Sequence, residues 1–130
     1  MSTTDLFSIL SPLRAQVESK IREELSGPLN AGKRFIYDSI MPLYLNVTGD
    51  SQECNLEFLP GGIVKLHSGL ALKPDATVNG ELASLRHSII SKSSSVFEEA
   101  EKNGKIIVKA QTWKGQEAMH RVRELLSSNQ

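Results

Sequence analysis

The sequence predicts an α/β fold of the α+β type, in which a mixed five-stranded sheet is covered on one face by helices. Apolar residues recur every fourth position over 13–25, which is typical of an amphipathic helix. Alternating apolar and polar residues over 43–67, interrupted by short turns, indicate three antiparallel strands. Residues 73–126 then predict a strand, two helices, a fifth strand and a final helix.

Length and charge restrict the class of protein. The chain has 130 residues, enough for one domain with its own core. Hydrophobic residues make up 39% and charged residues 23%, as in soluble globular proteins. Fifteen basic residues balance fifteen acidic ones, so we expect no nucleic-acid partner, which would need a net basic face.

The N-terminal third is expected to be helical. Asp5 can cap a short helix over Leu6–Leu10, and Ser11-Pro12 predicts a new helix start. One stripe of the second helix faces a core until Ser26-Gly27-Pro28 ends it. Another short helix precedes Pro42. We therefore divide the chain into a helical extension, 1–34, packed on a main domain, 35–130. The two apolar stripes are Leu13, Val17, Ile21 and Leu25, and then Phe35, Ile36, Ile40 and Met41.

Each strand of the central region has one apolar and one polar face, so one face should meet helices. Gly49-Asp50-Ser51 and Pro60-Gly61-Gly62 are the expected turns, too short for crossovers. A fourth strand begins after Pro74 and a fifth follows Asn103-Gly104. Because two helices connect these strands, we expect them to be parallel if they are adjacent. The apolar strand positions are Leu43, Leu45, Val47, Cys54, Leu56, Phe58, Val64, Leu66, Ala76, Val78, Ile106, Val108 and Ala110.

No residues form a convincing catalytic or metal-binding set. Cys54, the single cysteine, shares the parity of buried strand positions and is predicted to be a core residue. No pair of the histidines, His67, His87 and His120, has metal-ligand spacing. We therefore predict neither an enzyme nor a cofactor.

Three segments resemble the sterol carrier protein domain family, the nonspecific lipid-transfer fold. They are Leu45-Asn46-Val47-Thr48-Gly49, Pro74-Asp75-Ala76-Thr77-Val78 and the strand Asn103–Ala110, followed by an amphipathic helix. The resemblance covers about residues 35–126. It departs from the family at Gln111–Gly115, where members usually carry Gly-Asp and a small apolar residue, and in its longer helical lead.

The resemblance implies an apolar tunnel between sheet and helices, and makes 35–130 a sterol-carrier-protein-like lipid-binding domain. Its expected function is non-enzymatic binding and transfer of fatty acids, acyl-CoA, sterol-like molecules or other lipids. Trp113 is interpreted either as a cap on the core or as a rim residue, and Met119 and Val122 either as core or as lipid contacts. The candidate lining residues are Leu56, Phe58, Val64, Leu66, Ile89, Phe97, Trp113, Met119 and Val122.

Two other functions compete with this one. An accessory protein would present a lipid-like metabolite to a partner enzyme, with Leu6–Leu10 as the partner surface. A lipid hydrolase would need a nucleophile and base, for which Cys54 or a serine of 91–95 with His87 are the weakly supported choices.

A carrier must admit its ligand, and we expect residues 89–97 with the C-terminal helix to form the gate, because the serine loop lacks apolar anchors. Transient membrane contact would accompany transfer. The N-terminus lacks a signal peptide's basic start, no stretch of about 18 apolar residues spans a membrane, and a lone cysteine fits the cytosol, so we expect a cytoplasmic protein.

Overall fold

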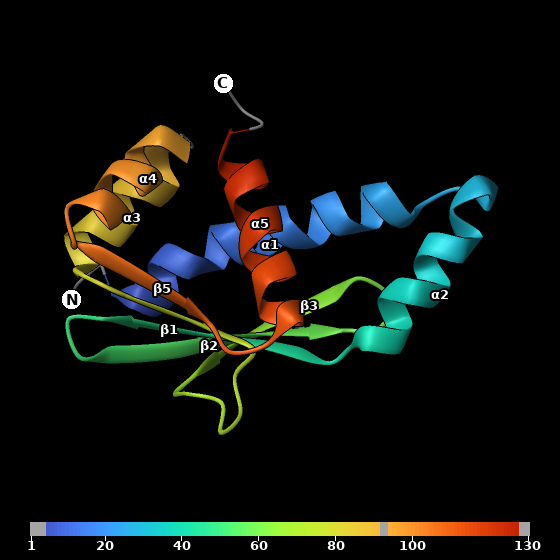
Figure 1. Cartoon of the computed structure of the whole chain (residues 1–130), viewed down its shortest axis with the longest axis horizontal. Coiled ribbons are helices and arrows are strands. Elements are labelled where there is room, and N and C mark those ends of the chain that lie inside the picture. The colour runs from blue at the N-terminus through green and yellow to red at the C-terminus, as the bar shows by residue number, and fades with distance from the viewer. Residues whose placement is uncertain (1–4, 92–93, 128–130) are drawn as a thin grey trace.

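A five-stranded mixed sheet organises the protein, with strand order β3-β2-β1-β4-β5 (Figure 1). The computed structural model describes residues 5–91 and 94–127. β1 pairs with β4 in parallel, and the other neighbours are antiparallel. The elements are α1 (Leu6–Leu25), a 3₁₀ turn (Pro28–Asn30), α2 (Ala31–Ile40), β1 (Leu43–Gly49), β2 (Gln52–Leu59), β3 (Ile63–Ser68), β4 (Ala76–Gly80), α3 (Leu82–Ser91), α4 (Ser94–Lys102), β5 (Ile106–Ala110) and α5 (Trp113–Ser127).

Strand alternation builds the core as the sequence predicts. In the β1–β2 ladder, Leu45 lies opposite Leu56 and Val47 opposite Cys54, and all four side chains are buried. α1, α3, α4 and α5 lie on the same side of the sheet, while α2 projects beyond one end of it (Figure 1). The predicted fold class, a mixed five-stranded sheet with helices on one face, is confirmed.

The predicted direction of β5 is wrong, because β4 and β5 are adjacent and antiparallel. Gly80, the last residue of β4, lies opposite Ile106, the first of β5, and Glu81 N–H donates to the Lys105 carbonyl at 3.1 Å. The α3–α4 pair therefore returns the chain to the end of the sheet it left. A connection makes two adjacent strands parallel only when it crosses over and returns the chain to the opposite end of the sheet.

The predicted break at Ser11-Pro12 is also wrong, because α1 is one helix that contains Pro12. Asp5 caps it as expected, accepting a hydrogen bond from Ser8 N–H at 2.7 Å. A proline inside a helix costs about 3 kcal/mol. Burial of a large aliphatic side chain contributes about 1.5–3 kcal/mol, so a few such residues on each side offset that cost. The buried residues of α1 are Leu6, Ile9, Leu10, Leu13, Val17, Ile21 and Leu25.

The expected partner surface at Leu6–Leu10 is therefore part of the core. Leu6 and Leu10 are only 0% and 2% exposed, Ile9 is buried, and Phe7 alone of the apolar residues there is exposed. The helical spacing turns this apolar cluster toward the sheet rather than toward solvent.

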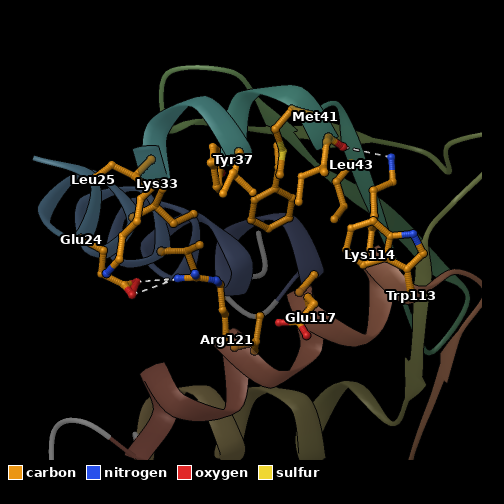
Figure 2. Close-up of a pocket in the computed structure, with 17 residues that line it drawn as sticks. Glu24, Leu25, Lys33, Tyr37, Met41, Leu43, Trp113, Lys114, Glu117 and Arg121 are labelled. Atoms are coloured by element: carbon orange, nitrogen blue, oxygen red, sulfur yellow. Dashed lines mark hydrogen bonds and ion pairs between the residues drawn. The ribbon is translucent and has the colours of Figure 1, made fainter. Parts of the chain in front are cut away.

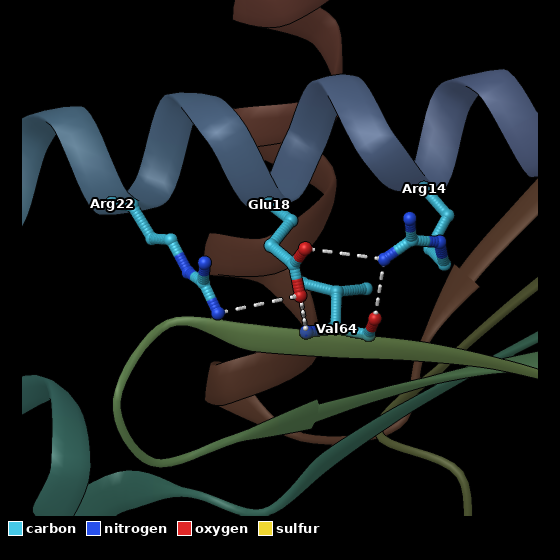
Figure 3. A network of polar contacts seen from close by, with 4 residues as sticks. All are labelled: Arg14, Glu18, Arg22 and Val64. Atoms are coloured by element: carbon cyan, nitrogen blue, oxygen red, sulfur yellow. Dashed lines mark hydrogen bonds and ion pairs between the residues drawn. The ribbon is translucent and has the colours of Figure 1, made fainter.

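Side chains of α1 occupy the outer edge of the sheet at β3 (Figure 3). Glu18 Oε2 accepts a hydrogen bond from Val64 N–H at 2.9 Å, and Arg14 Nη1 donates to the Val64 carbonyl at 2.9 Å. Arg14 and Arg22 flank the same carboxylate at 3.3 and 4.0 Å. The bond from Val64 lowers the pKa of Glu18. The edge amide and carbonyl are thus satisfied without another strand.

Asp75 links the sheet to the start of α5 through hydrogen bonds. Its carboxylate accepts hydrogen bonds from Tyr44 N–H at 2.9 Å and from the Thr112 hydroxyl at 2.9 Å. Its carbonyl accepts from the N–H groups of Gln111 and Thr112, at 2.8 and 3.2 Å. Gly115 in the first turn of α5 leaves room for that carbonyl. The Pro-Asp pattern thus marks the joint that positions α5.

Candidate functional site

An open apolar pocket of about 340 Å³ lies between α1, α2 and α5, with the start of β1 and the end of β2 as its floor (Figure 2). The pocket is open because α2 buries only Tyr37 and leaves Phe35 and Ile36 largely exposed. The helix therefore does not pack fully against the core. The lining residues are Val17, Ile21, Glu24, Leu25, Lys33, Ile36, Tyr37, Ile40, Met41, Leu43, Phe58, Trp113, Lys114, Glu117, Ala118, Arg121 and Val122.

Each helix contributes one face to this pocket. Lys33, Ile36, Tyr37 and Ile40 follow the i, i+3, i+4, i+7 spacing of a single helical face. The contribution of α5 has the same spacing, and α1 supplies the C-terminal half of its buried stripe. The α5 residues with this spacing are Lys114, Glu117, Ala118, Arg121 and Val122, and Trp113 at the start of α5 also lines the pocket.

Polar side chains lie at both ends of the pocket, and Figure 2 places Glu117 between them. Glu24, Lys33 and Arg121 lie at one end, and Trp113 and Lys114 at the other (Figure 2). Arg121 Nη1 contacts both oxygens of Glu24, at 2.6 and 2.9 Å, which joins α5 to α1. Lys114 Nζ donates to the Ile40 carbonyl at 3.0 Å, which joins α5 to the end of α2.

Tyr37 is a polar exception inside the pocket. The residue is 8% exposed, and burial raises the pKa of its phenol to about 12. Its buried hydroxyl has no hydrogen-bond partner within the described chain. A phenol with this pKa stays protonated at neutral pH, so it presents an unused donor.

A second, smaller cavity of about 40 Å³ lies beneath α5, and Val122 borders both cavities. Its lining is apolar except for Ser88, whose hydroxyl donates to the Ser84 carbonyl at 2.9 Å. The Val122 side chain therefore stands between two apolar spaces. The other lining residues are Leu10, Leu13, Leu45, Val47, Leu56, Val78, Leu85, Ile89, Phe97 and Met119.

The structure separates the predicted lining residues into three groups. Phe58, Trp113 and Val122 line the large pocket. Leu56, Ile89, Phe97, Met119 and again Val122 line the small cavity, and Val64 and Leu66 line neither of these two. Lys92 and Ser93, in the expected gate, lie outside the described residues, so gating there stays a prediction.

Sequence reasoning missed the contributions of α1 and α2 to the pocket, and most of those of α5, Arg121 among them. The signal was the spacing of Lys33, Ile36, Tyr37 and Ile40, which marks one face of a helix whose neighbouring apolar residue, Phe35, points elsewhere. A helix with apolar residues on more than one face has apolar surface left after it packs.

The residues considered for catalysis lie apart from the pocket lining. Cys54 is buried in β2, and burial raises the pKa of its thiol, which disfavours the nucleophilic thiolate. His67 contacts Glu57 at 2.8 Å and lowers the pKa of that carboxyl. His87 is exposed on α3. Across the described ranges, no three His, Cys, Asp or Glu side chains are grouped to hold a metal ion.

The fold is similar to that of two solved structures, one of which is named for an SCP2 domain. A UbiJ-SCP2 ubiquinone synthesis protein superposes with a TM-score of 0.50 at 18% identity, over 89% of this chain and 93% of its own. A double mutant of the sec-alkyl sulfatase PisA1 superposes with a TM-score of 0.63 at 17% identity, over 95% of this chain but 16% of the sulfatase. No model of a known protein family and no curated protein matches the sequence.

Within residues 5–91 and 94–127, the helices all lack the combination of length and hydropathy that crossing a membrane requires.

Proposed function

We propose that this protein binds a hydrophobic ligand in the pocket between α1, α2 and α5 and transfers it without catalysis. One observation carries the proposal: an apolar cavity of about 340 Å³ opens beside an SCP2-like sheet. Ligand pockets for small molecules typically measure roughly 300–1,000 Å³. The proposed ligands are fatty acids, acyl-CoA, sterol-like molecules or other lipids.

Apolar transfer supplies the affinity. Each methylene group that leaves water for the pocket contributes about 0.8 kcal/mol. Val17, Ile21 and Phe58 offer only aliphatic and aromatic surface to such a chain. Because hydrophobic contact is non-directional, the lining should accept hydrocarbon chains of several shapes.

Exposure of the walls favours uptake and release. Ile36 and Trp113 line the pocket yet are 64% and 63% exposed, so the ligand would meet the protein at α2 and the start of α5. A carrier with this opening would touch a membrane transiently while exchanging its ligand. We propose the cytoplasm as its compartment, where a lone buried Cys54 would stay reduced.

Two measurements test binding. Native mass spectrometry of the purified protein should find co-purified lipid, and a fluorescent fatty acid should bind and be displaced by unlabelled fatty acid. Trp113, the single tryptophan, should report the same event through its fluorescence.

A matched pair of variants locates the site. Ala118→Phe places a ring in the pocket and should abolish binding, whereas Ala83→Phe on the exposed surface of α3 should leave it unchanged. Absence of co-purified lipid together with no fatty-acid binding by the unaltered protein would reject the carrier function.

A second candidate is an accessory protein that presents a lipid-like metabolite to a partner enzyme. Leu29 and Phe35 are 98% and 76% exposed near the pocket, and exposed apolar side chains in one region favour a contact surface. The analogy with a ubiquinone synthesis protein rests on fold alone. Replacing Leu29 and Phe35 with serine should then abolish partner capture and leave ligand binding intact. Unchanged capture would reject this surface.

A further inference from the structure

Little apolar contact attaches α2 to the rest of the fold. Tyr37 is the one buried residue of this helix, whereas Phe35 and Ile36 are 76% and 64% exposed. The pocket of about 340 Å³ separates α2 from α1 and α5, so a cavity lies where side chains would otherwise pack (Figure 2). Most of the stability of a helix in a protein comes from packing of its apolar face. Undocking α2 from the core would therefore give up little of the apolar burial that stabilises the protein.

Polar bonds near the C-terminal end of α2 add to this attachment. Asp38 Oδ1 accepts a hydrogen bond from Gly61 N–H at 2.8 Å, in the turn between β2 and β3. Lys114 Nζ donates to the Ile40 carbonyl at 3.0 Å, at the start of α5. The first of these bonds is exposed and the second is only partly buried. Water can therefore take over both partners when α2 moves away.

The docked position of α2 also includes an unfavourable group. The hydroxyl of Tyr37 is buried and has no hydrogen-bond partner among residues 5–91 and 94–127. A buried hydroxyl without a partner has lost its bonds to water and gained none in return, so it raises the free energy of the docked state. Moving α2 away from the core would return this hydroxyl to water. The ring of Tyr37 thus favours docking of α2, while its hydroxyl favours release.

The chain at the start of α2 permits such a movement. Gly27 precedes the helix with φ 89°, and a side chain at this position would meet nothing within 4 Å. Loop residues of this kind can absorb the change of backbone angles that a hinge requires. The helix itself has ten residues and contains Gly32, and so short a helix is marginal in water on its own. An undocked α2 would therefore unfold readily and exchange its amide protons.

We propose that α2 is a lid on the apolar pocket, which undocks from α5 and from the β2–β3 turn while the sheet and the other helices stay folded. The unpaired hydroxyl of Tyr37 sets how readily the lid opens, because the docked state buries it and the open state hydrates it. The use of this opening to admit and release a ligand rests on the proposed function, whereas the motion belongs to the ligand-free protein. The lid is a different element from the gate predicted at residues 89–97.

Native-state hydrogen exchange of the ligand-free protein tests the motion. The amides of α2 and of Gly61 should exchange faster than the amide of Val17, which lies in the buried stripe of α1. Their exchange rates should also be independent of urea at low concentration, because a local opening exposes little surface. Exchange at Val17 should accelerate with urea, as global unfolding does. If the amides of α2 exchange at the rate of Val17 and with the same urea dependence, α2 opens only when the whole protein unfolds, and the inference is wrong.

Two substitutions should move the lid in opposite directions. Tyr37→Phe keeps the ring and removes the unpaired hydroxyl, so it should slow the urea-independent exchange of α2 by about tenfold. Lys114→Met removes the bond to Ile40 without altering the sequence of α2, and should accelerate that exchange by about tenfold.

Tyr44→Phe is the matched control. It removes a phenol whose hydroxyl donates to Glu57 at 3.2 Å and which lies outside the pocket lining, so the urea-independent exchange of α2 should not change. An unchanged exchange rate in Tyr37→Phe, or an equal change in Tyr44→Phe, would show that the Tyr37 hydroxyl does not control the lid.

The rate at which a bound fluorescent fatty acid dissociates tests whether the lid is the entrance. Release should slow in Tyr37→Phe and accelerate in Lys114→Met, in proportion to the exchange of α2. Release rates that stay constant while exchange changes would mean that the ligand leaves by another route, and the lid would not be the entrance. If the unaltered protein binds no fatty acid, the carrier function fails, and the exchange measurement still decides whether α2 opens.

Discussion

The backbone carbonyl of Asp75 occupies the place where Gly115 would carry a side chain. A Cβ on Gly115 would lie 1.7 Å from that oxygen and 2.5 Å from its carbon. The glycine is therefore required by the close approach of α5 to Asp75, the residue before β4, because this contact involves backbone that no side-chain rotation can relieve.

Gly115→Ala should consequently destabilise the protein by about 3 kcal/mol, at the upper end of what overpacking usually costs. Gly32→Ala is the control, since a Cβ there meets nothing within 4 Å and the position is helical. It should stabilise the protein by about 0.5–1 kcal/mol. Urea unfolding measures both, and equal midpoints for the two variants would contradict the close-approach argument.

Thr112 completes the same joint by capping α5. Its hydroxyl donates to Asp75 at 2.9 Å and accepts from Gly115 N–H at 3.1 Å. Thr112→Val should lower the unfolding free energy by about 1 kcal/mol, as loss of a helix cap does. Thr112→Ser keeps the hydroxyl and should restore most of that loss in the same denaturant titration. A serine variant as unstable as the valine variant would show that the methyl group matters instead.

Glu18 makes stability depend on acid. Its pKa is lowered in the folded protein, mainly by the Val64 N–H bond, from an ordinary value of 4.5. The contribution of Glu18 is thus fully present above that value and is lost as pH falls through the lower, folded pKa. The original protein should exceed Glu18→Gln in stability at pH 7, and the gap should narrow below about pH 4.5. Thermal midpoints across this range measure the gap, and a gap independent of pH would refute the assignment.

Val122 should set how long a tail the pocket accepts. Val122→Ala would connect the two cavities that Val122 borders, at a cost in stability of about 1.5–3 kcal/mol. The ratio of affinities for hexadecanoate and dodecanoate should rise in this variant and fall in Val122→Phe. The same ratio in both variants would mean that ligands do not reach the small cavity.

Local patterns predicted the elements, and tertiary packing decided what they could not. Alternation fixed which side of β1 and β2 faces the helices, because the period of a strand leaves one choice of buried face. Pro12 predicted a break in the helix, but the burial of apolar side chains on both sides of it stabilises one continuous helix. The direction of β5 depends on how α3 packs on α4, which no local pattern records.

The pocket was harder to predict than the sheet. An apolar stripe such as Val17 and Ile21 has the same sequence pattern whether it packs against side chains or lines a cavity. The sequence therefore identified the apolar face of the helix but could not separate core residues from pocket-lining residues. Phe58, Trp113 and Val122 line the large pocket, while Val64 packs in the core beside α1. Tyr37 stands out only once its hydroxyl is seen to be buried.

The contact of Arg14 and Glu18 with the outer edge of β3 affects the concentration at which this protein can stay unaggregated in a cell. A carrier does not turn over its cargo, so its abundance must match the amount of ligand it holds. Crowded sheets polymerise through unprotected outer strands. Here Arg14 and Glu18 bond the amide and carbonyl of Val64 at one border, and exposed Lys105 and Lys109 lie beside and within the strand at the opposite border. Both borders oppose filament growth, as the proposed carrier function would require of a protein present at high concentration.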